Sequence, residues 1–378
     1  MDAQTAEDGW DNLGPARKRQ RTDHLEDTKE LVITDRETLV RDDKYYRADG
    51  DCIIKVENTL FKIHRFLLAR DSSAFQNMFS FPTNDKEVVE GSSDEYPVPL
   101  IGDTAEKFRV LLSVMYALPL ELQAYNSTTA AIDSLMTIAE MTNKYHFTTM
   151  ETWAVDALHN VLSGAYGKPQ TDLATCNSTT LARLLETAIL CNHTGLRSLI
   201  VSKWANRILL RDIGPALAIV VADRHALRSL QGIAYYVQLM EVGSDPQKLR
   251  ADTTLNRDQR ARLLSGHWSL VKLWDRLRIS APAFQRSDGC TFHSHGCSKV
   301  WEDQWLEAGK NEKTLAYSSA DVLGRLRCMK ENLMMNGEIV LRLTPQCRKA
   351  AVESLWRTIK EVEDGLADHF SDLTQCPE

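Results

Sequence analysis

The residues best suited to chemistry are two cysteines and two histidines within eight consecutive positions: Cys290, His293, His295 and Cys297. Zinc in proteins takes four ligands in a tetrahedron, and cysteine thiolates and histidine nitrogens are its usual ligands. Four ligands drawn from so short a run would strain the backbone. We therefore expect the run to supply Cys290, His293 and Cys297, with His295 as the alternative to His293.

A tetrahedral site then needs a further ligand from elsewhere in the chain. Cys328 and Cys347 are the available residues, and neither belongs to a Cys-x-x-Cys pair. The competing interpretation is a glycine-containing loop whose thiols are simply buried ahead of a helix that carries Trp301 and Trp305. Apart from this structural zinc, the sequence predicts no cofactor.

No other group of residues has the spacing of a catalytic site. The sequence contains no glycine-rich phosphate loop, no His-Glu-x-x-His and no Gly-x-Ser-x-Gly motif. A catalytic histidine needs partners within hydrogen-bonding reach, and none is indicated for His64, so we expect a buried structural histidine there. Acidic pairs such as Asp42 and Asp43 are expected to face solvent. The chain is therefore predicted not to be an enzyme.

The clearest secondary-structure pattern runs from Gly50 to Phe79. Side chains alternate between the two faces of a strand, which predicts two strands that place Cys52, Ile54 and Val56, then Phe61 and Ile63, on one face. Asp71 or Ser72 is expected to cap the helix that follows. Phe75, Met78 and Phe79 have the spacing of one buried helix face. The stretch therefore predicts a β-hairpin followed by two short helices.

An ordered set of residues in this stretch and beyond it matches a known pattern: Asp51, Phe61, His64, Arg65, Leu68, Ser72, Phe75, Phe108, Tyr116 and Tyr145. In this order they resemble the signature of the BTB (POZ) domain, over roughly residues 43–165. The rest of the chain is similar to a fungal family that joins one BTB domain to a helical C-terminal region. A string of this length in order is far more specific than a short motif.

The resemblance implies a function in protein interaction. BTB domains form homodimers through their N-terminal part and first helices, and they recruit a protein partner, often a cullin-type ubiquitin ligase scaffold. The helical half would then select a client. The alternative is a nuclear regulator whose BTB domain binds a corepressor, although this chain lacks the zinc-finger repeats usual in that class. The acidic insertion at residues 80–96 follows the helix that family members present to a cullin.

Length and pattern together indicate two domains. A chain of 378 residues is long for one hydrophobic core. We expect an α+β BTB domain with a small sheet and a helical cluster, followed by an all-α domain. The expected segments are a disordered tail at 1–30, the BTB domain at 31–165, a linker at 166–180, the helical domain at 181–370 and a polar tail at 371–378.

Helical periodicity dominates the second half of the chain. Leu181, Leu184, Leu185 and Ala188 form one apolar stripe. Another is predicted on a helix near residues 258–277, with Leu264, Trp268, Val271 and Trp274 facing inward. Both stripes are interpreted as core.

Charge and cysteine usage limit the environment of the chain. A formal net charge of −7 argues against a general nucleic-acid-binding surface, and no apolar run is long enough to span a bilayer. The N-terminus lacks the apolar core of a secretory signal, so the eight cysteines are expected to be free thiols inside the cell, in the nucleus, the cytoplasm or both. One basic cluster consists of Arg17, Lys18, Arg19 and Arg21. It is either a nuclear-import signal or a basic patch in a solvated tail.

Overall fold

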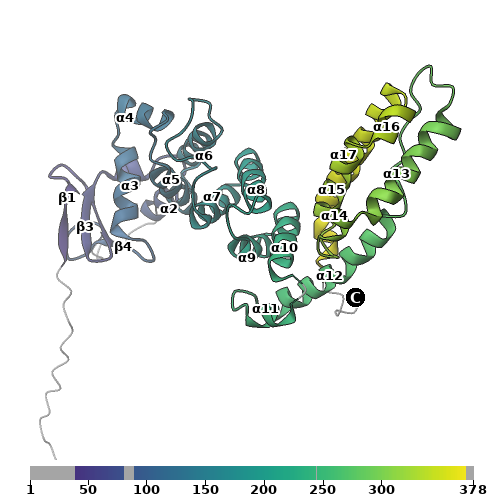
Figure 1. The fold of residues 1–378 in the computed structure, drawn as a ribbon. Coiled ribbons are helices and arrows are strands. Elements are labelled where there is room, and N and C mark those ends of the chain that lie inside the picture. Colours follow the sequence, from purple (N-terminus) through teal and green to yellow (C-terminus); the bar gives the residue numbers. More distant parts are fainter. Residues whose placement is uncertain (1–38, 81–88, 244, 372–378) are drawn as a thin grey trace, which may run out of the picture. The chain divides into compact units, whose positions relative to one another are not determined.

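The computed structural model describes residues 39–80, 89–243 and 245–371 (Figure 1). The candidate nuclear-import residues, Arg17, Lys18, Arg19 and Arg21, lie outside the described residues, as do residues 81–88 of the acidic insertion. The division of the chain into domains at 31–165, 166–180 and 181–370 stays a prediction.

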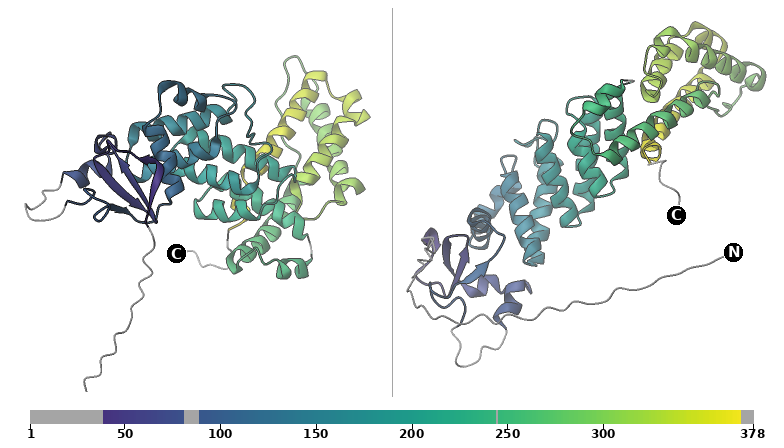
Figure 2. Two further views of the ribbon diagram at one scale, coloured as in Figure 1. Left: turned by 90° about the vertical axis from the view of Figure 1, so that its left-hand side faces the viewer. Right: turned by 90° about the horizontal axis from the view of Figure 1, so that it is seen from below.

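A four-stranded mixed sheet opens the described region (Figure 2). Its strands are β1 (Val40–Tyr46), β2 (Cys52–Val56), β3 (Thr59–Ile63) and β4 (Val98–Leu100), in the spatial order β1-β3-β2-β4. β2 and β3 form the predicted antiparallel hairpin, in which Ile54 lies opposite Phe61. β1 runs parallel to β3, and β4 runs parallel to β2 at the other edge. An edge position suits β4 because Pro99 has no N–H to donate to a neighbouring strand.

Helices cover this sheet and share its core. They are α1 (Arg65–Leu68), α2 (Ala74–Phe79), α3 (Ala105–Met115), α4 (Pro119–Gln123), α5 (Ile132–Lys144) and α6 (Thr148–Leu162), with a 3-10 turn at Ala124–Asn126. The inward side chains of the hairpin are fully buried, and Phe61 meets Phe108 of α3 edge-on at a centroid distance of 5.0 Å. The expected α+β architecture of this region is thereby confirmed.

The cap of α2 differs from the expectation. Ser73, not Asp71 or Ser72, occupies the N-cap, and its hydroxyl accepts from the N–H of Gln76. Asp71 instead accepts a hydrogen bond from the Thr149 hydroxyl at 2.8 Å, so it ties this turn to the start of α6. Asp71 and Ser72 both have positive φ angles, whereas an N-cap residue typically has an extended backbone. The N-cap therefore falls at Ser73, the residue after Ser72.

The rest of the described chain is helical, as predicted. Its helices are α7 (Ser178–Leu190), α8 (Thr194–Leu209), α9 (Ala216–Arg224), α10 (Arg228–Val242), α11 (Pro246–Ala251), α12 (Arg257–Leu277), α13 (Ser298–Lys310), α14 (Glu312–Leu315), α15 (Val322–Met334), α16 (Gly337–Arg342), α17 (Pro345–Asp364) and α18 (Leu366–His369). Within the described residues, none of these helices is both long and apolar enough to cross a membrane.

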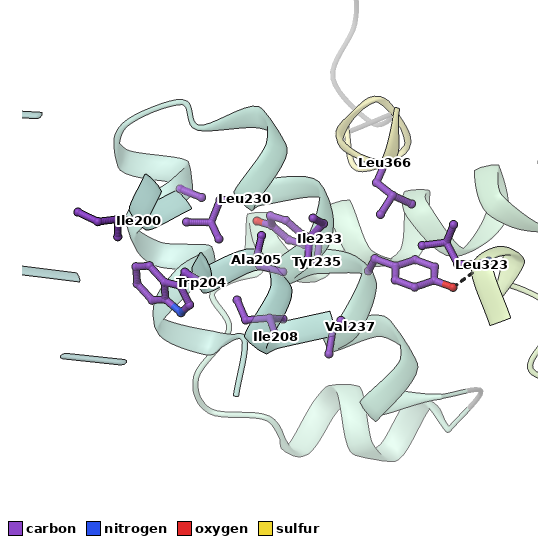
Figure 3. Close-up of a cluster of buried hydrophobic side chains, with 14 of the residues drawn as sticks. Ile200, Trp204, Ala205, Ile208, Leu230, Ile233, Tyr235, Val237, Leu323 and Leu366 are labelled. Atoms are coloured by element: carbon purple, nitrogen blue, oxygen red, sulfur yellow. Dashed lines mark hydrogen bonds between the residues drawn. The ribbon is translucent and has the colours of Figure 1, made fainter. Parts of the chain in front are cut away.

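Helix α10 lies at the centre of the helical core (Figure 3). It is buried on nearly every side, which is typical of a helix enclosed by others; α8, α9 and α18 contact it. The hydroxyl of Tyr236 accepts from the N–H of Leu323 at 3.1 Å and so links α10 to α15. Gly232 allows the backbone of α18 to pack closely on α10, because a Cβ at this position would lie 2.5 Å from the backbone nitrogen of Ala367.

One predicted helix face is partly wrong. On α12, Trp274 is buried as predicted and Val271 is partly buried, but Leu264 and Trp268 are 62% and 55% exposed. The buried side of the helix carries Leu263, Gly266, Leu270 and Trp274. The cause is Gly266, where a Cβ would lie 2.2 Å from the ring of Phe370. The absence of a side chain at Gly266 leaves room for the ring of Phe370. The spacing of apolar residues does not reveal this, because glycine is not counted among them.

Candidate functional site

The residues of the BTB-like pattern join the hairpin to the helices around it. The carboxylate of Asp51 accepts from the backbone N–H of Arg65 at 2.6 Å and so satisfies a free donor in the first turn of α1. Leu68 of α1 is fully buried, whereas Ser72 is exposed and caps no helix. Asp51 and Leu68 therefore fix the start of α1 on the sheet.

His64 holds the junction between β3 and α1. Its Nδ1 lies 2.8 Å from the hydroxyl oxygen of Tyr116, which also accepts from the His64 N–H at 3.1 Å. Its Nε2 lies 3.5 Å from the carboxylate of Asp49. The ring is partly buried, not fully buried as predicted. These contacts tie the hairpin to the C-terminal end of α3, which is a structural role.

Two aromatic residues of the pattern, Phe75 of α2 and Tyr145, stack on each other. The ring of Phe75 lies 4.7 Å from that of Tyr145 and 6.2 Å from that of Phe147. The hydroxyl of Tyr145 donates to Asp103, which also pairs with Lys144 at 2.7 Å. Burial raises the pKa of Tyr145, and Asp103 raises it further, so the tyrosine stays protonated. Phe75 and Tyr145 therefore form the packed centre of this half.

One buried carboxylate was not foreseen. Asp42 on β1 was expected to face solvent, but it is buried, and it accepts from Arg109 of α3 at 2.6 Å and from the N–H groups of Lys44 and Tyr45. Burial acts to raise the pKa of Asp42, but these hydrogen bonds outweigh it and the pKa lies below its ordinary value. No alternating pattern indicated this burial, because residues three apart, such as Asp42 and Tyr45, lie on opposite faces of a regular strand. The register of β1 on β3 shifts between Arg41 and Tyr46.

The second group of interest is the cysteine–histidine cluster, defined here as Cys290, His293, Cys297 and Cys347. One potential ligand atom from each residue lies within 4.8 Å of the others. The Sγ atoms of Cys290 and Cys297 are 3.9 Å apart, and Sγ of Cys347 lies 3.5 Å from Nδ1 of His293. The three cysteines are buried and the histidine is partly buried.

Local turns place these four residues. A turn closed by the Cys290 N–H on the Ser287 carbonyl at 3.2 Å contains Gly289 with a φ of 75°, which glycine tolerates best. A π-helical turn, His293–Cys297, then leads directly into α13. π-helical turns are rare in proteins, and those that occur often lie at functional sites.

The last member of the cluster comes from the start of α17. Thr344 caps that helix, Pro345 occupies its first position, and Cys347 lies in the first turn. The structure thus brings together the three residues predicted from the short run and one of the two distant cysteines. It leaves out His295, which is exposed, and Cys328, whose thiol contacts Thr314.

The thiols of the cluster differ in acidity. Burial acts to raise the pKa of Cys347, but hydrogen bonds from Ser287, Thr344 and His293 outweigh it and hold the pKa well below its ordinary value. Burial raises the pKa of Cys297. None of the seven cysteines within the described residues is in a disulfide.

Comparison with protein families gives one match. The family model of the BTB/POZ domain matches residues 46–160, which run from the end of β1 to near the end of α6. Comparisons with curated proteins and with solved structures found no match. The part of the resemblance that concerns the BTB domain is therefore confirmed, while the similarity of the whole chain to a fungal family stays a prediction.

Proposed function

We propose, with the BTB/POZ domain at residues 46–160 as the premise, that this chain is a non-enzymatic protein-interaction module that self-associates through that domain and recruits a protein partner. The family match is the observation that carries the proposal, since BTB domains typically mediate protein interaction and dimerisation and are not catalytic. The pattern residues His64, Phe75 and Tyr145 serve packing and hydrogen bonding within the domain.

A second copy of this chain is the proposed occupant of the surface around β1 and α1. The resemblance places dimerisation in the N-terminal part and first helices of the domain. In that part of the chain, Val40 and Phe66 are each 59% exposed. Among the described residues β1 is an edge strand, so one row of its backbone groups has no strand partner there. Two-fold symmetry would bring the same surface of two copies together.

Two exposed apolar residues of this half provide a matched test. Phe66→Asp places a charge on the proposed surface, whereas Ile101→Asp changes a residue that is 88% exposed beyond β4. Light scattering of the full chain at tens of micromolar should give a dimer for the wild type and for Ile101→Asp, and a monomer for Phe66→Asp. A Phe66→Asp variant that remains fully dimeric would exclude α1 from the interface.

The more specific proposal is a substrate adaptor for a cullin-type ubiquitin ligase, with the helical half selecting the client. The insertion between α2 and β4 is anchored at its end, because Asp94 accepts from the Arg41 side chain at 2.7 Å and from the Tyr46 hydroxyl at 2.6 Å. A cullin scaffold should co-purify with tagged full-length chain from cells. Its absence, in protein that still dimerises, would remove the adaptor function and leave self-association intact.

The alternative is a nuclear regulator whose BTB domain recruits a corepressor. The observation that favours it is the basic cluster of the N-terminal tail, at Arg17, Lys18, Arg19 and Arg21. Nuclear import of the protein and co-purification of a corepressor in place of a cullin would support this alternative.

A further inference from the structure

We propose that Cys290, His293, Cys297 and Cys347 bind one structural zinc ion that joins the start of α13 to the start of α17. The inference is independent of the proposed BTB function, because no residue of the cluster lies in the BTB domain. It rests on the geometry of four potential ligand atoms that come from two distant parts of the chain.

Two of the separations within the cluster match those of a tetrahedral zinc site, and all of the potential ligand atoms lie within 4.8 Å of one another. With zinc–sulfur distances of about 2.3 Å and zinc–nitrogen distances of about 2.0–2.1 Å, two sulfurs lie about 3.8 Å apart, and sulfur and nitrogen lie about 3.6 Å apart. The sulfurs of Cys290 and Cys297 are separated by 3.9 Å. The Cys347 sulfur and the His293 Nδ1 are separated by 3.5 Å. Both pairs therefore need little movement to share one ion.

The surroundings of the ligands favour the same arrangement. His293 directs Nδ1 at Cys347, while its Nε2 lies 3.3 Å from the hydroxyl of Ser298 and can donate to it. Outer hydrogen bonds of this kind fix the tautomer and the orientation of a metal-bound histidine. The hydroxyl of Ser287 lies 3.0 Å from the Cys347 sulfur and can donate to a thiolate there. The edge of Phe284 packs on the His293 ring at a centroid distance of 5.0 Å.

The ligand set selects zinc among the common metals. Magnesium and calcium prefer oxygen ligands, whereas three thiolates and one imidazole in a tetrahedron are typical of zinc. A disulfide between Cys290 and Cys297 is the competing chemistry, but its sulfurs would have to approach to about 2.05 Å from the observed 3.9 Å. Because the protein supplies all four ligands, the site has no open position for a substrate and is structural.

Zinc would join two parts of the fold that are distant in the chain, the π-helical turn His293–Cys297 and the start of α17. The π-helical turn His293–Cys297 contacts the start of α17, and it leads into a helix whose Trp301 and Trp305 are buried. The indole N–H of Trp301 donates to the Pro282 carbonyl at 3.0 Å, which links this helix to the segment ahead of the cluster. Loss of the ion should therefore loosen the segment from Pro282 to Trp305.

The test is the zinc content of the full chain and of two matched pairs of variants, purified without chelator. The wild type should hold about one zinc per chain, since closed sites bind tightly. His293→Ala and Cys347→Ser should lose most of it. His295→Ala and Cys328→Ser, which change the exposed histidine and the buried cysteine outside the cluster, should keep it. Equal loss in His293→Ala and His295→Ala would overturn the assignment of ligands.

A second measurement on wild-type protein keeps the test valid if a variant fails to fold. Chelation should change the tryptophan fluorescence, and added zinc should restore it. Cobalt(II) in place of zinc should give the absorption bands of a tetrahedral thiolate site. Less than about a tenth of a zinc per chain in the wild type would overturn the proposal, as would a Cys290–Cys297 disulfide found by mass spectrometry in freshly purified protein.

Discussion

Replacement of Phe75 by alanine tests the packing of the BTB half most sharply. Phe75 is 2% exposed, and its ring stacks on Tyr145 at 4.7 Å. Transfer of a buried phenylalanine contributes about 1.5–3 kcal/mol, and each aromatic pair adds about 0.5–1.5 kcal/mol. With the cavity that remains, the variant should lose about 3–5 kcal/mol of stability.

Hydrogen exchange of the backbone amides of β2 and β3 is the appropriate assay, because a chain of this size need not unfold in one step. Ile101→Ala is the control, since Ile101 is 88% exposed and its loss should change stability by no more than about 0.5 kcal/mol. A loss below about 1 kcal/mol in Phe75→Ala would refute the buried stack. Equal effects in the two variants would refute it as well.

Three further predictions follow from individual residues. The hydrogen bond from Arg109 helps to hold the pKa of Asp42 low, so the ionised Asp42 stabilises the fold at neutral pH, and this stabilisation is lost as the pH falls through the folded-state pKa. Asp42→Asn should therefore cost about 1–3 kcal/mol of stability at pH 7. In melting temperatures measured against pH, the variant should show a flatter decrease on the acid side. Gly232→Ala should cost about 1–3 kcal/mol in thermal unfolding because its Cβ would meet backbone at 2.5 Å, whereas Gly337→Ala, with open space around it, should be near neutral. The basic cluster consists of Arg17, Lys18, Arg19 and Arg21. If it is an import signal, replacing all four residues by alanine should move a fluorescent fusion of the protein to the cytoplasm. An unchanged distribution between nucleus and cytoplasm would contradict that role.

The sequence predicted the sheet well where the pattern was purely local. Cys52, Ile54 and Val56 alternate with less buried positions on a strand, so a period of two was enough to assign their face. The face of α12 was partly misassigned because its buried surface includes Gly266, which receives the ring of Phe370 from far along the chain. Burial of Asp42 likewise depends on Arg109 of α3.

The cysteine–histidine cluster shows the same limit. The short run fixed Cys290 and Cys297, because close spacing along the chain makes them neighbours in space. The sequence did not choose between Cys328 and Cys347, because only tertiary packing brings the start of α17 to the π-helical turn. The Thr344-Pro345 pair, a strong helix start, was the local feature that could have placed Cys347 in a first turn.

The central claim is that the chain self-associates through its BTB/POZ domain. It is tested most directly by the molar mass of the full-length wild-type chain, measured by light scattering at tens of micromolar. The proposed function predicts twice the mass of a single chain, with dissociation only at much lower concentration. A mass equal to that of one chain throughout this range would contradict it.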